Sequence, residues 1–291
     1  MTPSDTTFVI ASRNRATELA VVVGRLLDTT ACPIVVVDNA SEDHSVALMR
    51  RLATRSAHRL RLIELDTNRG AVGRNFGVAA CTTPYVAFSD DDSWWTPESP
   101  EIGAELFDRH PSVGLLAART IVWPQRCEDP FAGLLADSAL GRRDDLPGPS
   151  VLGFMSCAAM VRVSAFQQAG GFSDILHFRG EEQLLAWDLA ASGWDLCYCP
   201  QLTAIHQPSQ VRATTAAQDA RVLRNSVLTT WLRRPIAQCL GATRHLLRGA
   251  IRDREHARGA AEAILKLPAV LRQRRRLPAS VEDAVSTLEA Q

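Results

Sequence analysis

The chain has 291 residues, of which 46% are hydrophobic and 22% are charged, and its formal net charge is zero. This composition is typical of a soluble globular protein with enough apolar material for one large domain or two small ones. No apolar run approaches the roughly 18 residues of a membrane span, and no secretion signal is visible. The seven cysteines have neither a disulfide framework nor a paired C-x-x-C pattern, which predicts reduced thiols in a cytoplasmic protein.

Charge is distributed unevenly along this neutral chain. Residues 212–291 carry 15 basic and 7 acidic side chains, so the preceding residues carry a net charge of −8. We therefore predict two parts, a catalytic domain over residues 1–210 and a basic helical extension over residues 211–291.

Strands and helices alternate along the N-terminal part. Short apolar runs predict four buried strands, at residues 7–12, 33–38, 60–65 and 85–88. Apolar residues at helical spacing predict three helices between them, beginning near Leu19, near Val46 and at Ala71. This alternation predicts an α/β fold with a parallel sheet.

The elements after the fourth strand are more varied. We predict a helix over residues 97–110, a strand over 113–122, a loop-rich insertion over 123–150 and an apolar segment over 153–163. A short helix over 165–172 and a helix over 180–192 follow, then a strand over 195–199 and His206 in a loop. In the extension, helices are predicted around residues 223–231, 240–251 and 260–271, before an arginine-rich run at 272–276.

Three acids, Asp90, Asp91 and Asp92, follow the fourth strand directly. Two unit charges about 4 Å apart repel by about 4 kcal/mol at an effective dielectric of 20, so three neighbouring carboxylates favour a cation. Carboxylate oxygens suit Mg²⁺ or Mn²⁺, and the carboxyl ends of strands are where open α/β sheets bind ligands. A solvated acidic turn is the alternative.

Two nucleotide-binding motifs are absent from the sequence. Gly70, Gly73 and Gly77 do not form G-x-G-x-x-G, and no G-x-x-x-x-G-K-[ST] occurs. The sequence therefore disfavours the hypotheses that the protein is a dinucleotide-dependent oxidoreductase or a P-loop enzyme.

Six segments together form a more specific pattern. They lie at residues 12–15 (SRNR), 35–41 (VVVDNAS), 68–77 (NRG through GRNFG), 88–92 (FSDDD), 170–172 (GGF) and 180–182 (GEE). Their order and spacing resemble those of family 2 glycosyltransferases with the GT-A fold, over residues 6 to about 208. The resemblance implies a Rossmann-like mixed, mainly parallel sheet flanked by helices, here followed by a C-terminal helical extension.

The resemblance assigns one group of residues to the donor nucleotide. Asp38 is implied to accept a hydrogen bond from the nucleobase. A residue in the turn before a helix is the alternative, but the position of Asp38 at the C-terminal end of a predicted strand favours the binding site. Ser12, Asn14 and Arg15 are implied to line the same pocket, with Arg74 nearby. Asp90 and Asp91 complete the set of residues implied to bind the donor.

A divalent metal site is also implied. Asp90 and Asp92 occupy the two acidic positions of the D-x-D motif, and His206 resembles a further ligand for Mg²⁺ or Mn²⁺. In such a site the ion stabilises negative charge on the leaving diphosphate. A surface or packing histidine is the alternative for His206.

Glu182 lies where the family has its catalytic aspartate, and Glu181 precedes it. Such a carboxylate deprotonates an acceptor hydroxyl as that oxygen attacks the anomeric carbon, and a single displacement inverts the configuration. Because glutamate is one methylene longer than aspartate, the choice of base between the two stays open. The alternative is that both are N-terminal helix acids that complement the macrodipole.

The predicted activity is transfer of a sugar from a nucleoside-diphosphate sugar to a hydroxyl of a glycan, lipid-linked or small-molecule acceptor. One alternative is a non-catalytic nucleotide-sugar-binding module, indifferent to Glu182→Gln. A second is a sugar-1-phosphate nucleotidyltransferase, which needs a glycine-rich first loop that residues 12–15 lack. A third is a metal-dependent phosphohydrolase, which would release inorganic phosphate.

The basic extension has several candidate partners. We favour packing against the acidic domain or a second subunit, as in a homodimer. The alternative is a cytoplasmic protein that makes peripheral contact with anionic lipid at the inner face of the membrane. Nucleic acid is disfavoured because the basic residues lack interleaved aromatics.

Overall fold

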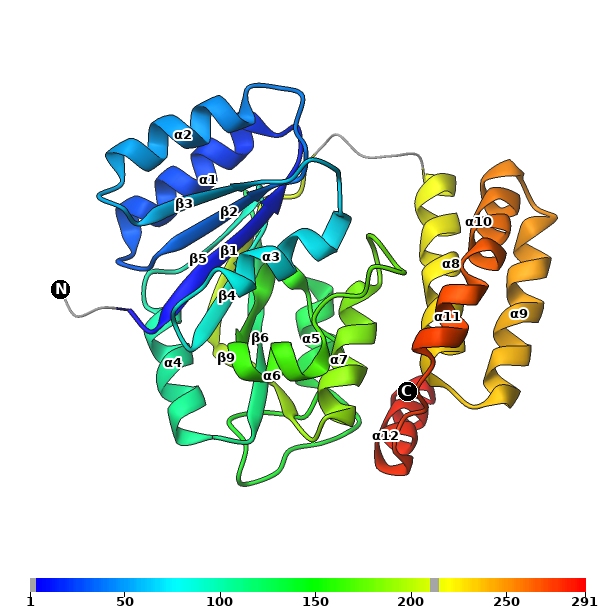
Figure 1. The fold of residues 1–291 in the computed structure, drawn as a ribbon. Helices are drawn as coiled ribbons and strands as arrows, with labels where there is room; N and C mark the ends of the chain where they lie inside the picture. Colours follow the sequence, from blue (N-terminus) through cyan, green and yellow to red (C-terminus); the bar gives the residue numbers. More distant parts are fainter. Residues whose placement is uncertain (1–3, 210–214) are drawn as a thin grey trace.

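The computed structural model describes residues 4–209 and 215–291. They form an α/β domain with a group of helices beside it (Figure 1). The boundary predicted between residues 210 and 211 lies outside the described residues, so it stays a prediction.

One half of the sheet is parallel. Strands β1 (Thr6–Ser12), β2 (Ile34–Asp38), β3 (Leu60–Glu64) and β4 (Tyr85–Ser89) lie in the order β3-β2-β1-β4. Ser12 pairs with Asp38, so the loops after β1 and β2 leave the same edge of the sheet. The segments that resemble a donor site therefore meet at the edge where open α/β sheets bind ligands.

The other half of the sheet is mixed. It contains β8 (Ala159–Arg162), β6 (Val113–Val122), β9 (Asp195–His206) and β5 (Ser93–Trp95), in the order β8-β6-β9-β5, with β7 (Cys127–Glu128) pairing with β6. Strand β8 runs antiparallel to both β4 and β6, whereas β6 and β9 are parallel. The expected mixed, mainly parallel sheet is confirmed.

The predicted position of His206 in a loop is wrong. Strand β9 continues beyond Cys199 and ends at His206, which pairs with Ser93 of β5. The register against β6 shifts between Cys199 and Thr203, so an irregularity accommodates Pro200, which has no N–H to donate. The proline interrupts the apolar pattern but not the strand.

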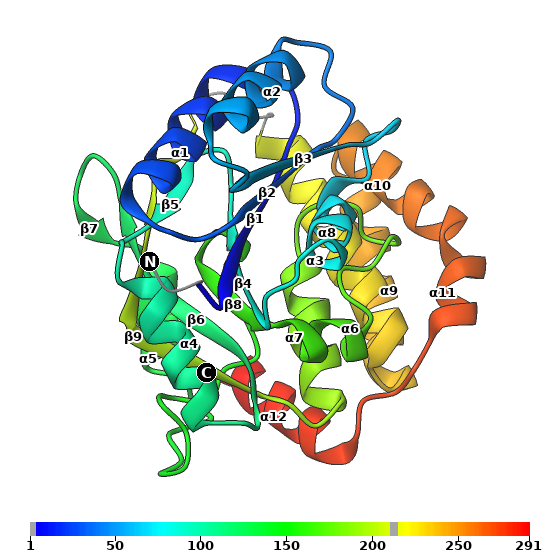
Figure 2. The same ribbon diagram turned by 60° about the vertical axis from the view of Figure 1, so that its left-hand side comes forward.

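The side chains of β1 alternate between two cores. Phe8 and Ile10 belong to a cluster that includes side chains of α1 (Ala16–Thr29), α2 (Ser45–Arg55) and α4 (Ser99–Arg109). Val9 belongs to a second cluster, shared with α3 (Gly73–Ala79), α6 (Val163–Ala169) and α7 (Glu181–Ala191). Figure 2 shows α1 and α2 on one side of β1–β3 and α3 on the other. Burial on both faces explains why β1 is an almost continuous apolar run.

Two predicted segments differ in detail. The helix predicted from Ala71 begins as a 3₁₀ turn at Gly70–Val72 and becomes α3 at Gly73. The insertion over residues 123–150 contains a short helix, α5 (Pro130–Ala136), whose N-cap Asp129 accepts a hydrogen bond from the Phe131 amide.

The extension contains α8 (Thr215–Arg233), α9 (Ile236–Ala250), α10 (Arg254–Leu265), α11 (Leu267–Gln273) and α12 (Ala279–Glu289). The helix predicted over residues 260–271 is divided in two, because Pro268 lies in the first turn of α11 and favours a new helix start. Helix α12 was not predicted. No helix in the described part of the chain is long and apolar enough to span a bilayer.

Apolar packing and one buried ion pair attach the extension to the domain. Ile175, Leu176 and Leu184 of the domain share a core with Val227 and Leu228 of α8. Helix α12 packs beside α7 through a second cluster. The expected packing of the extension on the domain is thus observed, and both apolar clusters and an ion pair take part in it.

The ion pair joins Asp188 of α7 to Arg233 of α8. The pair is bidentate, with Arg233 Nη2 2.8 Å from Asp188 Oδ2, and the two side chains are 8% and 6% exposed. Breaking such a pair removes the close partner of a buried charge, which costs about 3–5 kcal/mol. The exposed Arg275, 3.7 Å from Asp188 Oδ1, compensates this charge only weakly.

We therefore expect Arg233→Met to lower the free energy of unfolding by about 3–5 kcal/mol in urea titrations. Arg50→Met is the matched control, because Arg50 pairs with Glu64 on the surface. That variant should change stability by no more than about 1 kcal/mol. Equal stability of the two variants would contradict an anchoring role for the buried pair.

Candidate functional site

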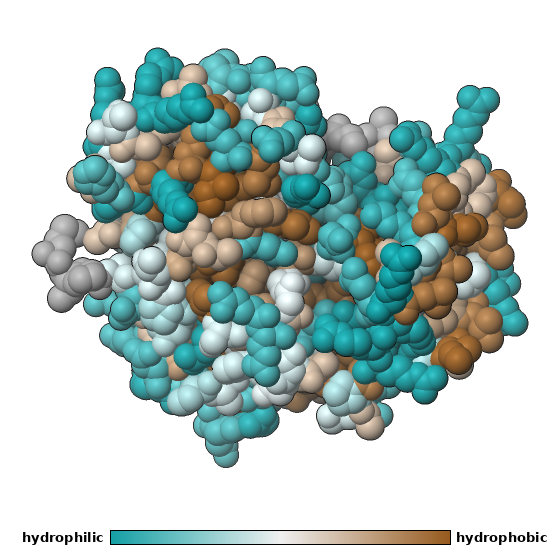
Figure 3. Space-filling model, in the orientation of Figure 1, coloured by the Kyte–Doolittle hydropathy of each residue, from teal (hydrophilic) through white to brown (hydrophobic). Residues whose placement is uncertain are grey.

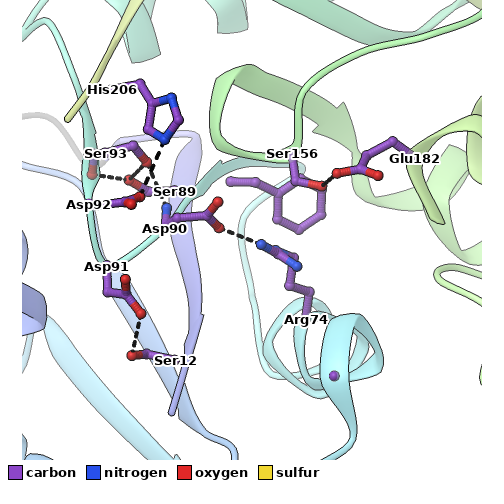
Figure 4. Close-up of polar contacts among 12 residues, drawn as sticks. Ser12, Arg74, Ser89, Asp90, Asp91, Asp92, Ser93, Ser156, Glu182 and His206 are labelled. Atoms are coloured by element: carbon purple, nitrogen blue, oxygen red, sulfur yellow. Dashed lines mark hydrogen bonds and ion pairs between the residues drawn. The ribbon is translucent and has the colours of Figure 1, made fainter. Parts of the chain in front are cut away.

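The acidic triplet forms a fixed turn after β4. Ser93 Oγ accepts a hydrogen bond from the Asp90 amide at 2.7 Å, and Ser89 Oγ donates to the Ser93 carbonyl at 2.6 Å. The three carboxylates point to three different partners (Figure 4). The structure therefore gives each acid of the triplet a separate environment.

Asp90 faces Arg74 of α3. The Arg74 guanidinium donates to Asp90 Oδ1, and Arg74 is only 4% exposed. Burial opposes the charge on Arg74, but the negative charges of Asp90, Glu181 and Glu182 outweigh it and raise the pKa of the guanidinium. A cation therefore lies between the triplet and the start of α7. Asp90, predicted to bind donor and metal, is held by this cation.

Asp91 faces the loop after β1. Ser12 Oγ donates to Asp91 Oδ2 at 2.7 Å, and Arg15 Nε lies 3.4 Å from Oδ1. Burial, reinforced by the charges of Asp90 and Asp92, raises the pKa of Asp91 to about 6 despite the Ser12 hydrogen bond. Two of the predicted donor residues thus meet the triplet directly.

Asp38 has an unused acceptor atom. Its side chain is 4% exposed, and Oδ2 accepts a hydrogen bond from the Ser41 amide at 2.9 Å. Oδ1 is buried and has no partner among the described residues. A buried carboxylate oxygen is costly to leave unpaired, which favours a ligand donor at this position.

Asn14 contacts the loop that follows β2. Its Oδ1 accepts from the Glu42 amide at 2.7 Å, and its own amide donates to Ser41 Oγ at 2.9 Å. These bonds join the loops after β1 and β2, and the side chain is directed to backbone rather than to a cavity. A donor contact by Asn14 stays a prediction.

Asp92 and His206 lie together because β5 and β9 pair. His206 Nε2 is 3.6 Å from Asp92 Oδ1. Burial and the charge of Asp90 raise the pKa of Asp92, while His206 opposes this shift. Across residues 4–209 and 215–291, no group of three or more His, Cys, Asp and Glu side chains is arranged to hold a metal ion.

A two-residue arrangement still fits a hard divalent ion. Mg²⁺ and similar ions commonly use one or two carboxylates and take their other oxygens from water and substrate phosphates. Asp92 supplies such a carboxylate, and His206 brings a nitrogen beside it. Asp90 pairs with Arg74 through Oδ1, so its Oδ2 could serve as a further oxygen ligand.

Glu181 and Glu182 begin α7 but differ in environment. Glu181 is 2% exposed, and its Oε2 lacks a partner among the described residues. Burial, and then the charge of Glu182, raises the pKa of Glu181 to about 8. Glu182 is half-buried and accepts a hydrogen bond from Ser156 Oγ at 3.0 Å (Figure 4). Glu181 is therefore largely neutral at pH 7, and the two glutamates are not equivalent.

A cavity of about 340 Å³ lies beside the triplet. The predicted residues Ser12, Arg74, Asp90, Asp91 and Asp92 line it, whereas Asn14, Arg15, Asp38, Glu181 and Glu182 do not. Other lining residues were not predicted: Asn39, Asn68, Gly70, His177, Phe178 and Arg221. A second cavity of about 710 Å³ shares Asp91 and Asp92 and includes Trp94 and Trp123. The triplet thus borders both cavities.

The loop over residues 175–180, just before α7, is fixed by the extension. Asn225 of α8 is fully buried, and its Nδ2 donates to the carbonyls of Leu176 at 3.1 Å and Phe178 at 2.9 Å. Within the loop, His177 and Arg179 have positive φ angles of 67° and 73°, which are unfavourable for such residues. Asn225 therefore holds a strained backbone next to the glutamates.

The same loop is fixed on its other side by Gly70. The amide of Ala71 donates to the His177 carbonyl at 2.7 Å, and a Cβ on Gly70 would lie 2.1 Å from that oxygen. Only glycine permits this approach. Two sequence features point to these contacts: Gly70 in the segment 68–77, and the polar Asn225 within the helix predicted around residues 223–231.

Comparison with known proteins gives one family. Residues 7–170 match the family described as glycosyl transferase family 2. The pre-mycofactocin glycosyltransferase of Mycobacterium tuberculosis is 32% identical over 216 residues, covering 69% of this chain and 42% of that protein. The succinoglycan biosynthesis protein ExoU of Rhizobium meliloti is 32% identical over 97 residues, covering 33% and 28%. This chain thus spans less than half the length of these curated relatives.

Solved structures share the fold. The mannosyltransferase PcManGT from Pyrobaculum calidifontis, in complex with GDP-Man and Mn²⁺, has a TM-score of 0.63 at 17% identity, covering 99% of this chain and 86% of that chain. S. aureus TarS in complex with UDP-GlcNAc has a TM-score of 0.60 at 14% identity, covering 96% and 83%. The predicted GT-A fold with C-terminal helices is confirmed. Because the family match extends over more than half of this chain, the chain belongs to the family 2 glycosyltransferases.

Proposed function

We propose that the protein is an inverting, metal-assisted glycosyltransferase that uses a nucleoside-diphosphate sugar. The observation that carries this proposal is the arrangement around Arg74. Asp90 pairs with this buried cation and lies after β4, next to Asp92 and His206. The two glutamates at the start of α7 lie close enough to influence the pKa of the same cation. Sugar transfer needs these two sets of groups close together, one for the leaving diphosphate and one for the attacking hydroxyl.

The smaller cavity is suited to the donor. Its lining combines hydroxyl and amide groups with the cations Arg13, Arg74 and Arg221, which complement a diphosphate. We assign the nucleobase to Asp38, whose Oδ1 has no partner among the described residues and whose neighbour Asn39 lines this cavity. The neighbours solved with GDP-Man and UDP-GlcNAc support a nucleotide-sugar donor of this general kind.

Asp92 and His206 would hold Mg²⁺ or Mn²⁺, and the Mn²⁺ in the mannosyltransferase complex supports this choice. When bound, the ion neutralises negative charge that develops on the diphosphate. Arg74 keeps Asp90 oriented beside this site, and Ser12 does the same for Asp91.

Glu182 is the better base. Its carboxylate accepts a hydrogen bond from Ser156, and it is less buried than Glu181, whose raised pKa leaves it largely protonated at pH 7. Glu182 takes the acceptor proton while the hydroxyl oxygen bonds to the anomeric carbon. The bond from that carbon to the diphosphate oxygen breaks on the opposite face, which inverts the configuration.

The acceptor hydroxyl belongs to a glycan, a lipid-linked molecule or a small molecule. The name of the Mycobacterium tuberculosis relative makes pre-mycofactocin a reasonable first acceptor to test. A nucleotide-sugar-binding module without activity would bind the same donors and release no nucleoside diphosphate.

The proposal is tested by two neighbouring variants. Glu182→Gln should lower the rate of transfer by about 10²- to 10⁴-fold, the contribution of a general base, and leave donor affinity unchanged. Glu181→Gln is the matched control and should retain most activity, since Glu181 is already largely neutral at pH 7. Release of nucleoside diphosphate from UDP-GlcNAc, GDP-mannose and UDP-glucose measures both. The reverse pattern would make Glu181 the base. If the natural protein and both variants are all inactive, the non-catalytic binding module is favoured.

The environment of Glu181 gives a separate prediction for stability. In the folded protein this carboxyl has a pKa of about 8, compared with 4.5 for an unperturbed glutamate. The unfolded state therefore loses its proton first, and the free energy of unfolding falls as pH rises between these values. Glu181→Gln removes this contribution.

Thermal unfolding from pH 4.5 to pH 8 measures the effect. We expect Glu181→Gln to gain stability over the natural protein progressively as the pH rises through this range. Parallel pH profiles for the two proteins would contradict a protonated Glu181.

A further inference from the structure

Exposed apolar side chains are concentrated in the extension. Of thirteen large hydrophobic residues exposed in the described part of the chain, nine lie in α8–α11 or at their ends. The four in the domain, Val21, Phe76, Leu134 and Phe178, are on separate elements. The extension therefore carries the main exposed apolar surface described here, and such surfaces commonly mark interaction sites.

Helix α9 presents an apolar stripe to solvent. Ile236, Leu240, Leu247 and Ile251 are spaced by four, seven and four residues, so they lie along one side of the helix. Their exposed fractions are 59%, 58%, 54% and 86%. Leu246, which is buried, packs on the core with α8 instead. The stripe is thus a second apolar side, separate from the one that holds the bundle together.

The exposed surface continues onto the next two helices. Ile264 and Leu265 end α10, and Leu267 and Leu271 lie one turn apart on α11, all of them exposed. Figure 3 shows hydrophobic residues gathered over the side of the molecule where Figure 1 places α9, α10 and α11. We call these exposed residues of α9–α11 the apolar face.

Basic side chains adjoin the apolar face. On α9, Arg244 follows Leu240 by four residues and Arg248 follows Leu247 by one. Lys266 lies in the sequence between the exposed residues of α10 and those of α11. No ion pair involving these three is found within the described residues. Apolar groups bordered by free cations are the composition of helices that lie in a membrane interface.

A second copy of the chain fits this face less well. Two apolar faces packed symmetrically would bring their flanking cations together, and like charges repel. The acidic domain of another copy offers only isolated large hydrophobic residues among those described. An anionic lipid surface satisfies both requirements, because it has an apolar interior and negative phosphates at its boundary.

We propose that α9, α10 and α11 dock the protein on an anionic lipid surface. The apolar face enters the boundary between headgroups and acyl chains, while Arg244, Arg248 and Lys266 contact lipid phosphates. The contact is peripheral, in agreement with the lack of a spanning helix in the described chain. It does not depend on the proposed sugar transfer.

Flotation of the full chain with lipid vesicles tests this proposal. The protein should float with vesicles of phosphatidylcholine and phosphatidylglycerol, stay behind with phosphatidylcholine alone, and dissociate at high salt, since surface charge is screened there. Leu240→Asp combined with Ile251→Asp should lower the bound fraction about tenfold or more. Arg244→Glu combined with Arg248→Glu should do the same.

Leu134→Asp is the matched control, because Leu134 is 63% exposed on α5 of the domain and should leave flotation unchanged. Melting temperatures confirm that each variant is folded. The proposal is overturned if the natural protein does not float, or if the apolar variants float equally well. It is also overturned if sedimentation equilibrium shows a dimer that the apolar variants abolish, since a second copy would then cover the face.

Discussion

The candidate site depends on the ion pair between the buried guanidinium of Arg74 and Asp90. Arg74 pairs with Asp90 after β4 and lies in the field of Glu181 and Glu182 at the start of α7, two elements far apart in the sequence. Without this cation, the carboxylates of Asp90 and Glu182 would lie near one another with no buried positive charge between the two elements, and like charges repel. Arg74 therefore allows acids with different tasks to share one edge of the sheet.

The extension contributes to the site as well as to stability. Asn225 of α8 fixes the loop before the glutamates, and Arg221 of the same helix lines the smaller cavity. The family match ends at residue 170, so both residues lie outside it. The helices that follow the domain thus contribute residues to the candidate site, and the buried pair of Asp188 and Arg233 joins α8 to α7.

Much of the fold was predictable from the sequence, and less of the site was. Continuous apolar runs predicted β1 to β4, and the acids after β4 indicated the edge of the sheet where a ligand binds. The partners of those acids, such as Ser12 for Asp91, depend on strand order and register, which have no local signal. Asn225 and Arg221 come from a helix remote in sequence, and a pattern of apolar spacing does not show what a polar residue will contact.

The most direct test of the central claim is thermal unfolding with UDP, GDP, ADP and CDP, each with and without Mn²⁺, for the natural protein and for Asp92→Ala. A ligand at about 100 times its dissociation constant adds about 2.7 kcal/mol, enough to raise the midpoint by a few degrees. We predict a shift for one nucleotide that requires Mn²⁺ and disappears in Asp92→Ala. A shift that is independent of the metal, or equal in the variant, would contradict the metal-assisted donor site.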